Sequence, residues 1–288
     1  MGTTEKSNPT DTFRTRMREQ QELLRYRMKQ VKPKVAVISG KGGVGKSTVA
    51  VNLAAAFALH GKHVGILDAD IHGPSVPRLL GLTGQQVKVG PPGAFPVMGP
   101  LGMKVVSIDF FLPEEKTPTI WRGPLKMTAI RQFLSDVVWG ELDVLFIDLP
   151  PGTGDEPLSV AQLLPDIDGV IIVTMPSELS RAVVKKAIEF AQRLGMPIIG
   201  VVENMSGYIC PTCGDKIDIF RSGGGKKMAE ETGVPFLGSI PIDPKIGVDS
   251  DKGLPFVMEH ADSLGAKAFV EIVQKVKAYL NEKENPKT

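Results

Sequence analysis

Short apolar runs alternate with amphipathic segments along this chain from Lys34 onward. The apolar runs are rich in Val and Ile, as in strands that are buried on both faces of a parallel sheet. The predicted strands are Val35–Ile38, Val64–Leu67, Val105–Ile108, Val144–Ile147, Val170–Val173, Ile198–Val202 and Phe236–Ile240. The predicted helices are Lys46–Leu59, Leu125–Val138, Leu179–Leu194, Gly225–Thr232 and Ser263–Asn281. This alternation predicts an α/β fold with a mostly parallel sheet and helices on both faces.

Two segments fall outside the alternation. Residues 1–33 are polar and charged, with a short predicted helix over Thr12–Val31, and we interpret them as a polar N-terminal extension. Residues 82–102 are rich in Gly and Pro and predict a long surface loop. We predict that residues 34–288 form one domain.

The composition of the chain argues against nucleic acid and membranes as partners. The net charge is only +2, which gives no basic surface for nucleic acid or anionic lipid. We find no apolar stretch long enough to span a membrane and no secretory signal at the polar N-terminus. Two cysteines cannot form a disulfide framework, which favours a reducing compartment. We therefore expect a cytoplasmic protein with no nucleic acid or membrane partner.

A glycine-rich loop separates the first predicted strand from the helix that follows it. It consists of Gly40, Lys41, Gly42, Gly43, Val44, Gly45, Lys46, Ser47 and Thr48. The spacing and the strand–loop–helix context match a P-loop, in which backbone N–H groups and a helix N-terminus bind phosphate oxygens. Lys46 is expected to reach the β- and γ-phosphates, and the Ser47 hydroxyl to bind Mg²⁺. Lys41 is an additional lysine, either a solvated side chain or a cation that reaches phosphate across a dimer interface.

Carboxylates follow two other predicted strands, at the edge where such sheets bind ligands. Asp70 is expected to orient or deprotonate the attacking water, or to hold Mg²⁺ through water, and Asp68 to support the metal shell. Asp148 fits a Walker B carboxylate. The loop 150–155 follows it and can change shape on hydrolysis.

The nucleotide is predicted to be ATP. The chain has no Asn/Thr-Lys-x-Asp run of the kind that reads guanine. Asn204 ends a predicted strand, where its side chain is either a turn residue or a partner for the base edge of adenine.

Cys210 and Cys213 are the only cysteines, in a Cys-x-x-Cys pair. Thiolates bind iron–sulfur clusters, zinc and Cu(I). A cubane cluster generally takes four thiolates, so one chain supplies half of them and two copies supply all. Three alternatives stay open: zinc within one chain, zinc bridging two copies, and a redox disulfide. No histidine lies at a spacing from the cysteine pair that is typical of a shared metal site; the four histidines are His60, His63, His72 and His260.

Together these motifs resemble the Mrp/ApbC family of P-loop ATPases, which carry iron–sulfur clusters. The matching residues are Gly40–Thr48, Asp68–Ser75, Trp121–Pro124, Asp148–Asp155, Glu203–Met205 and the two cysteines. The loop with Lys41 resembles the deviant Walker A loop of the nitrogenase iron protein and MinD/ParA class. The resemblance implies a homodimer, ATP hydrolysis and a [4Fe–4S] cluster shared between two chains. It implies that the residues acting at the nucleotide are Lys41, Lys46, Ser47, Asp70 and Asp148.

The resemblance supports an ATP-dependent iron–sulfur carrier that receives a cluster from donor proteins and passes it to recipient apoproteins, with slow hydrolysis used as a switch. Residues 1–33 contain no cysteine, which excludes the second, N-terminal cluster motif of some relatives.

The main alternative is a positioning ATPase like MinD or ParA, with no cluster. MinD would need a membrane-binding C-terminal helix, and ParA a basic patch for DNA. We interpret the apolar stripe near the C-terminus as core-facing; it consists of Phe269, Ile272, Val273, Val276, Tyr279 and Leu280. A third alternative is a small-molecule enzyme such as an ATP-dependent ligase, for which the sequence specifies no substrate.

Overall fold

The computed structural model describes residues 9–112, 123–164, 166–210, 213, 215–219 and 222–284. The strands are β1 (Lys34–Ile38), β2 (Val64–Asp68), β3 (Lys88–Gly90), β4 (Gly93–Phe95), β5 (Val97–Met98), β6 (Lys104–Val106), β7 (Val144–Asp148), β8 (Gly169–Thr174), β9 (Ile198–Glu203), β10 (Tyr208–Ile209), β11 (Lys216–Ile217) and β12 (Phe236–Ser239). The α-helices are α1 (Pro9–Lys29), α2 (Lys46–Leu59), α3 (Val76–Leu79), α4 (Gly123–Ser135), α5 (Asp155–Leu163), α6 (Glu178–Arg193), α7 (Gly224–Thr232), α8 (Pro244–Lys252), α9 (Phe256–Glu259) and α10 (Leu264–Glu284). The 3₁₀ turns are η1 (Pro100–Gly102) and η2 (Ile108–Phe111).

One sheet organises these elements, in the strand order β12-β9-β8-β1-β7-β2-β6-β5. All of its pairings are parallel except that of β5 with β6. The carboxyl ends of β1, β7 and β2 are therefore adjacent, and Asp68 pairs in register with Asp148. The Asp148 loop after β7 therefore lies between the phosphate loop after β1 and the Asp68–Asp70 loop after β2.

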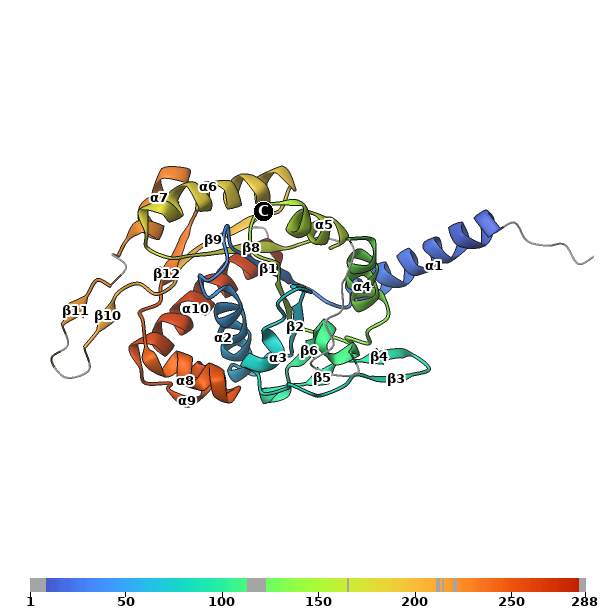
Figure 1. Ribbon diagram of the computed structural model, residues 1–288, viewed down its shortest axis with the longest axis horizontal. Helices are drawn as coiled ribbons and strands as arrows, with labels where there is room; N and C mark the ends of the chain where they lie inside the picture. Colours follow the sequence, from blue (N-terminus) through green and yellow to red (C-terminus); the bar gives the residue numbers. More distant parts are fainter. Residues whose placement is uncertain are drawn as a thin grey trace, which may run out of the picture.

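The sheet is buried on both faces, as predicted. Along β1 the side chains alternate, so that Val35 and Val37 join one apolar cluster while Ala36 and Ile38 join the other. Helices α2, α9 and α10 pack on the first face, and α4, α5, α6 and α7 pack on the second (Figure 1). The strands read as continuous apolar runs because neither face meets solvent.

The prediction of a long surface loop over residues 82–102 was wrong. β3 and β4 form an antiparallel hairpin, and β5 adds to the edge of the main sheet. The hairpin packs closely because a Cβ on Gly93, which has φ 134°, would lie 2.1 Å from the Asp136 carbonyl oxygen. The predicted strand Val105–Ile108 also ends early, at Val106, and Ile108 begins η2. Trp121 and Arg122 lie outside the described residues.

The N-terminal helix α1 is docked at its C-terminal end. Its first turns project from one end of the molecule (Figure 1). Leu24, Met28 and Val31, in contrast, are buried in the same apolar cluster as α4. Arg27 also donates through Nη2 to the Pro92 carbonyl at 2.5 Å. The interpretation of residues 1–33 as a polar extension therefore misses the part that belongs to the core.

Met28→Ala is expected to lower the free energy of unfolding by about 2–3 kcal/mol, because it removes a core side chain and leaves a cavity. Met28 is only 2% exposed. The matched control is Tyr26→Ala on the same helix, which is 60% exposed and should change the value by less than about 0.5 kcal/mol. Urea denaturation of both variants measures the difference. Equal effects would show that α1 does not pack on the body in solution.

The C-terminal helix α10 packs its apolar stripe against the sheet, which confirms the core-facing interpretation. Phe269, Ile272, Val273 and Val276 are each 1% exposed or less. Among the described residues, no helix has the length and apolar character needed to cross a membrane.

Candidate functional site

The phosphate loop connects β1 to α2 at the carboxyl edge of the sheet. Gly43 and Gly45 have left-handed φ angles of 78° and 77°, which glycine adopts without strain. Two hydrogen bonds of Ser39 hold the start of the loop. The Ser39 hydroxyl donates to the Lys41 carbonyl at 2.9 Å, and the Gly152 N–H donates to the Ser39 carbonyl at 2.8 Å. The second contact ties the phosphate loop to the loop that follows β7.

Lys46 and Asp148 form a buried ion pair in this loop. The distance from Lys46 Nζ to Asp148 Oδ1 is 2.5 Å, and the two side chains are 6% and 0% exposed. Lys46 Nζ also lies 3.3 Å from the Ser47 hydroxyl oxygen. The structure therefore brings together three of the residues that the sequence assigned to the nucleotide.

A second pair of carboxylates, Asp68 and Asp70, lies at the end of β2. The Asp68 carboxylate is fully buried and accepts hydrogen bonds from the backbone N–H groups of Asp70, Ser75 and Val76 at 3.0–3.1 Å. Burial raises the pKa of Asp68 well above its ordinary value, and the nearby charge of Asp148 raises that pKa further. Asp68 thus shapes the loop after β2, while Asp70 remains partly exposed and accepts from the Gly73 N–H at 3.2 Å.

Compared with the wild type, the Asp68→Asn variant is expected to become relatively more stable as pH rises. Because the pKa of Asp68 is raised by folding, the folded protein binds this proton more tightly than the unfolded chain does. The stability that Asp68 contributes is therefore greatest below the ordinary value of 3.8 and falls as pH rises toward the folded pKa. Asn does not titrate. Urea denaturation in EDTA, from pH 3.8 upward, measures the unfolding free energies of both proteins. A difference between them that does not change with pH would contradict the raised pKa.

The donor atoms around Lys46 fit a magnesium ion. Asp148 Oδ2 is buried and has no hydrogen-bond partner among the described residues. A buried carboxylate oxygen is costly unless a ligand or donor compensates it. Together with the Ser47 hydroxyl and the Asp70 carboxylate, it supplies the hard oxygen donors that Mg²⁺ prefers. These residues are therefore chemically suited to a nucleotide-bound Mg²⁺.

The side chain of Asn204 also contacts the phosphate loop. Asn204 follows β9, and its side-chain Nδ2 donates to the Val44 carbonyl at 2.9 Å in a buried hydrogen bond. This loop contact was not foreseen from the sequence, and the role of Asn204 at the adenine base stays a prediction. Lys41 is partly exposed at the start of the loop, and its reach to a phosphate across two copies likewise stays a prediction.

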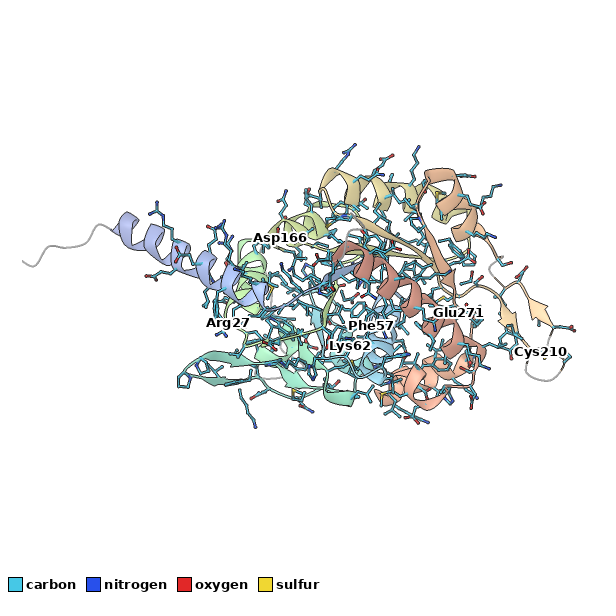
Figure 2. All side chains as sticks on the ribbon, turned by 180° about the vertical axis from the view of Figure 1, so that it is seen from behind. Arg27, Phe57, Lys62, Asp166, Cys210 and Glu271 are labelled. Atoms are coloured by element: carbon cyan, nitrogen blue, oxygen red, sulfur yellow. The ribbon has the colours of Figure 1, made fainter. Side chains whose placement is uncertain are left out.

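The two cysteines lie far from the nucleotide loops, at the end of a projecting hairpin. We call β10, β11 and the turn between them the cysteine hairpin; it extends from the end of the molecule opposite to α1 (Figure 1). Cys210 lies at its far end (Figure 2). The Cys210 N–H donates to the Asp215 carbonyl at 2.9 Å, and the Cys213 thiol lies 3.3 Å from Asp215 Oδ2.

The cysteine pair does not complete a metal site on its own. In the part of the chain that the structure describes, no group of three or more His, Cys, Asp or Glu side chains could hold a metal. Cys213 is exposed and Cys210 partly so, which leaves both within reach of a second molecule.

Comparison with known proteins identifies the family of this chain. The family described as "ParA: NUBPL iron-transfer P-loop NTPase" matches residues 30–277. The chain belongs to this family. Membership confirms the resemblance to cluster-carrying P-loop ATPases that the motifs indicated.

Two curated relatives are similar over most of their length, and both are named "Iron-sulfur cluster carrier protein". That of Methanocaldococcus jannaschii is 55% identical over 258 residues, covering 90% of this chain and 88% of its own. That of Saccharolobus solfataricus is 56% identical over 253 residues, covering 88% of this chain and 86% of its own.

Solved structures share the fold. A nucleotide-binding protein from Archaeoglobus fulgidus, solved in complex with ADP and with cobalt found in it, has a TM-score of 0.73 and 44% identity, covering 81% of this chain and 91% of its own. The cell division ATPase MinD of Pyrococcus furiosus has a TM-score of 0.60 and 22% identity, covering 85% of this chain and 98% of its own. The second likeness shows the fold alone.

Proposed function

We propose that this protein is an ATP-binding and ATP-hydrolysing carrier that holds a [4Fe–4S] cluster between two copies of the chain and transfers it to apoproteins. The observation that carries the proposal is the placement of the only two cysteines on a hairpin that projects from a P-loop NTPase body. The names of the archaeal relatives support the same cargo.

The nucleotide site supplies the switching step. We propose that Lys46 leaves Asp148 to neutralise the β- and γ-phosphate oxygens, and that the loop N–H groups hold the remaining oxygens. When bound, Mg²⁺ would offset phosphate charge, held by Ser47, Asp148 and, through water, Asp70. Asp70 is partly exposed, and we propose that it orients or deprotonates the attacking water. Lys41 is proposed to contact phosphate, from its own chain or from the second copy.

The cysteine hairpin supplies the cargo step. Four thiolates are the usual ligand set of a cubane cluster, and two copies related by a two-fold axis bring two pairs together. A cluster held by exposed loops is accessible to donor proteins and to recipient apoproteins. Such access suits transfer better than permanent storage.

Anaerobic reconstitution with iron and sulfide tests the proposal. The wild type is expected to bind one cluster for every two chains, with absorbance at roughly 400 nm from thiolate-bound iron. Cys210→Ala should abolish that absorbance while leaving ADP binding intact, because Cys210 belongs to a hairpin that projects from the body (Figure 1). Iron, sulfide and zinc analysis and the mass in solution accompany the spectra. Zinc in place of iron, an intramolecular disulfide, or equal cluster binding by the variant would contradict the proposal.

The positioning ATPase gains no support from this structure. The apolar stripe of α10 that a membrane-binding helix would need is part of the core. The likeness to MinD does not reach beyond the fold at 22% identity.

A further inference from the structure

One side chain, that of Glu203 at the end of β9, bonds to the chain segments that precede and follow the cysteine hairpin. The chain enters the hairpin after Ser206, whose hydroxyl donates to Glu203 Oε1 at 2.5 Å. It returns to the body at the start of α7, where the Gly223 N–H donates to Oε1 at 3.0 Å and the Gly225 N–H donates to Oε2 at 2.5 Å. Glu203 therefore joins the segment that leads into the hairpin to the start of α7, which follows the hairpin in the chain.

This carboxylate is fully buried, with an exposure of 0%. The ion pairs found among the described residues do not include it. A buried charge is costly without several donors, and an apolar side chain of similar volume is often no less stabilising. Stability alone therefore does not explain Glu203. What the charge adds is strength and direction in its hydrogen bonds, since charge-assisted bonds are stronger than neutral ones.

The residues after Glu203 contact the phosphate loop. Asn204 donates to the Val44 carbonyl, and a Cβ placed on Gly45 would lie 2.3 Å from the same Asn204 nitrogen. Met205 has a left-handed φ of 57°, which is uncommon for a residue other than glycine. The turn that follows β9 is thus held tightly. The side chain of Asn204 bonds to the phosphate loop, and that of the preceding Glu203 bonds to the segments that flank the hairpin.

We infer that Glu203 is a positioning residue that links nucleotide binding at the phosphate loop to the orientation of the cysteine hairpin. The inference rests on the proposed function, in which the nucleotide controls access to the cluster. Phosphate oxygens bind the loop N–H groups, so a change in the Val44–Gly45 peptide alters its contact with Asn204. Because Glu203 is the adjacent residue and bonds to the segments on both sides of the hairpin, a displacement of Asn204 changes how the hairpin is attached to the body.

The test is the rate at which iodoacetamide alkylates Cys210 and Cys213 in the metal-free full-length chain, with and without Mg-ADP. The protein is kept at a concentration at which ADP does not change its mass. In the wild type the rates are expected to differ by about fivefold or more between the two conditions. In Glu203→Gln an amide –NH₂ faces the N–H donors, and the ratio should fall to near one. The ADP dissociation constant should change by less than about threefold, a fraction of the 1.4 kcal/mol that corresponds to tenfold.

Matched variants separate positioning from simple support. Ser239→Ala removes only the 3.4 Å contact to Glu203 and should keep the wild-type ratio. If Glu203 only stabilised the fold, Glu203→Gln would raise the rates equally in both conditions; an unchanged ratio overturns the inference. Should Glu203→Gln fail to fold, Ser206→Ala, which removes one hairpin contact, must lower the ratio, and its failure to do so also overturns the inference.

The two proposals fail separately. Wild-type protein that binds a cluster but shows no ADP effect on alkylation overturns the positioning role alone. Protein that shows the ADP effect but binds no cluster overturns the carrier function alone.

Discussion

Lys46→Met is expected to lower ATP hydrolysis by about 100-fold or more, because it removes a preorganised cation from the phosphate site. It should also lower the free energy of unfolding by about 3–5 kcal/mol, since it leaves a buried carboxylate without its partner. That partner is Asp148, which is 0% exposed and 2.5 Å from Lys46 Nζ. Steady-state phosphate release and urea denaturation measure the two effects.

The double variant Lys46→Met/Asp148→Asn is the matched control. It removes both charges, so it should regain much of the stability that the single variant lost, while hydrolysis stays low. A single variant with wild-type stability would show that the Lys46–Asp148 pair does not persist in solution. Wild-type hydrolysis by either variant would remove Lys46 from the proposed mechanism.

Gly45→Ala is expected to lower the free energy of unfolding by about 2–5 kcal/mol, from backbone strain and from a lost buried hydrogen bond. Gly45 has φ 77°, and its new Cβ would lie 2.3 Å from the Asn204 side-chain nitrogen that bonds to Val44. The variant must therefore push Asn204 off the phosphate loop. Urea denaturation of the nucleotide-free protein measures the loss.

Gly43→Ala provides the comparison within the same loop. Gly43 has a nearly identical φ of 78°, but nothing lies within 4 Å of its added Cβ. It should show the backbone cost alone, about 1–2 kcal/mol. If the two alanine variants are equally stable, the Asn204 contact contributes nothing, and the link from the phosphate loop to the hairpin loses its first step.

The sequence predicted the long elements well because burial leaves a strong periodic signal. Helix α2 has the predicted bounds, Lys46–Leu59, and the central strands were found within a residue or two of their ends. The hairpins β3–β4 and β10–β11 were missed because strands of two or three residues are too short to show alternation. The docked end of α1 was missed for a different reason: its few buried residues are separated by charged ones that the packing on α4 leaves in solvent.

The sequence alone was enough to predict two kinds of site in this protein. The glycine spacing with Lys46 and Ser47 specifies a phosphate site, because local backbone geometry is enough to create one. The cysteine pair predicts a thiolate site, to which one chain supplies two ligands. The contacts around the phosphate loop became visible only in the folded chain. Lys46 meets Asp148, and Asn204 meets Val44, across long separations in the chain, because parallel strands bring their carboxyl ends to one edge of the sheet. At that same edge, the buried Glu203 bonds to the segments that flank the cysteine hairpin, next to the residue that contacts the phosphate loop.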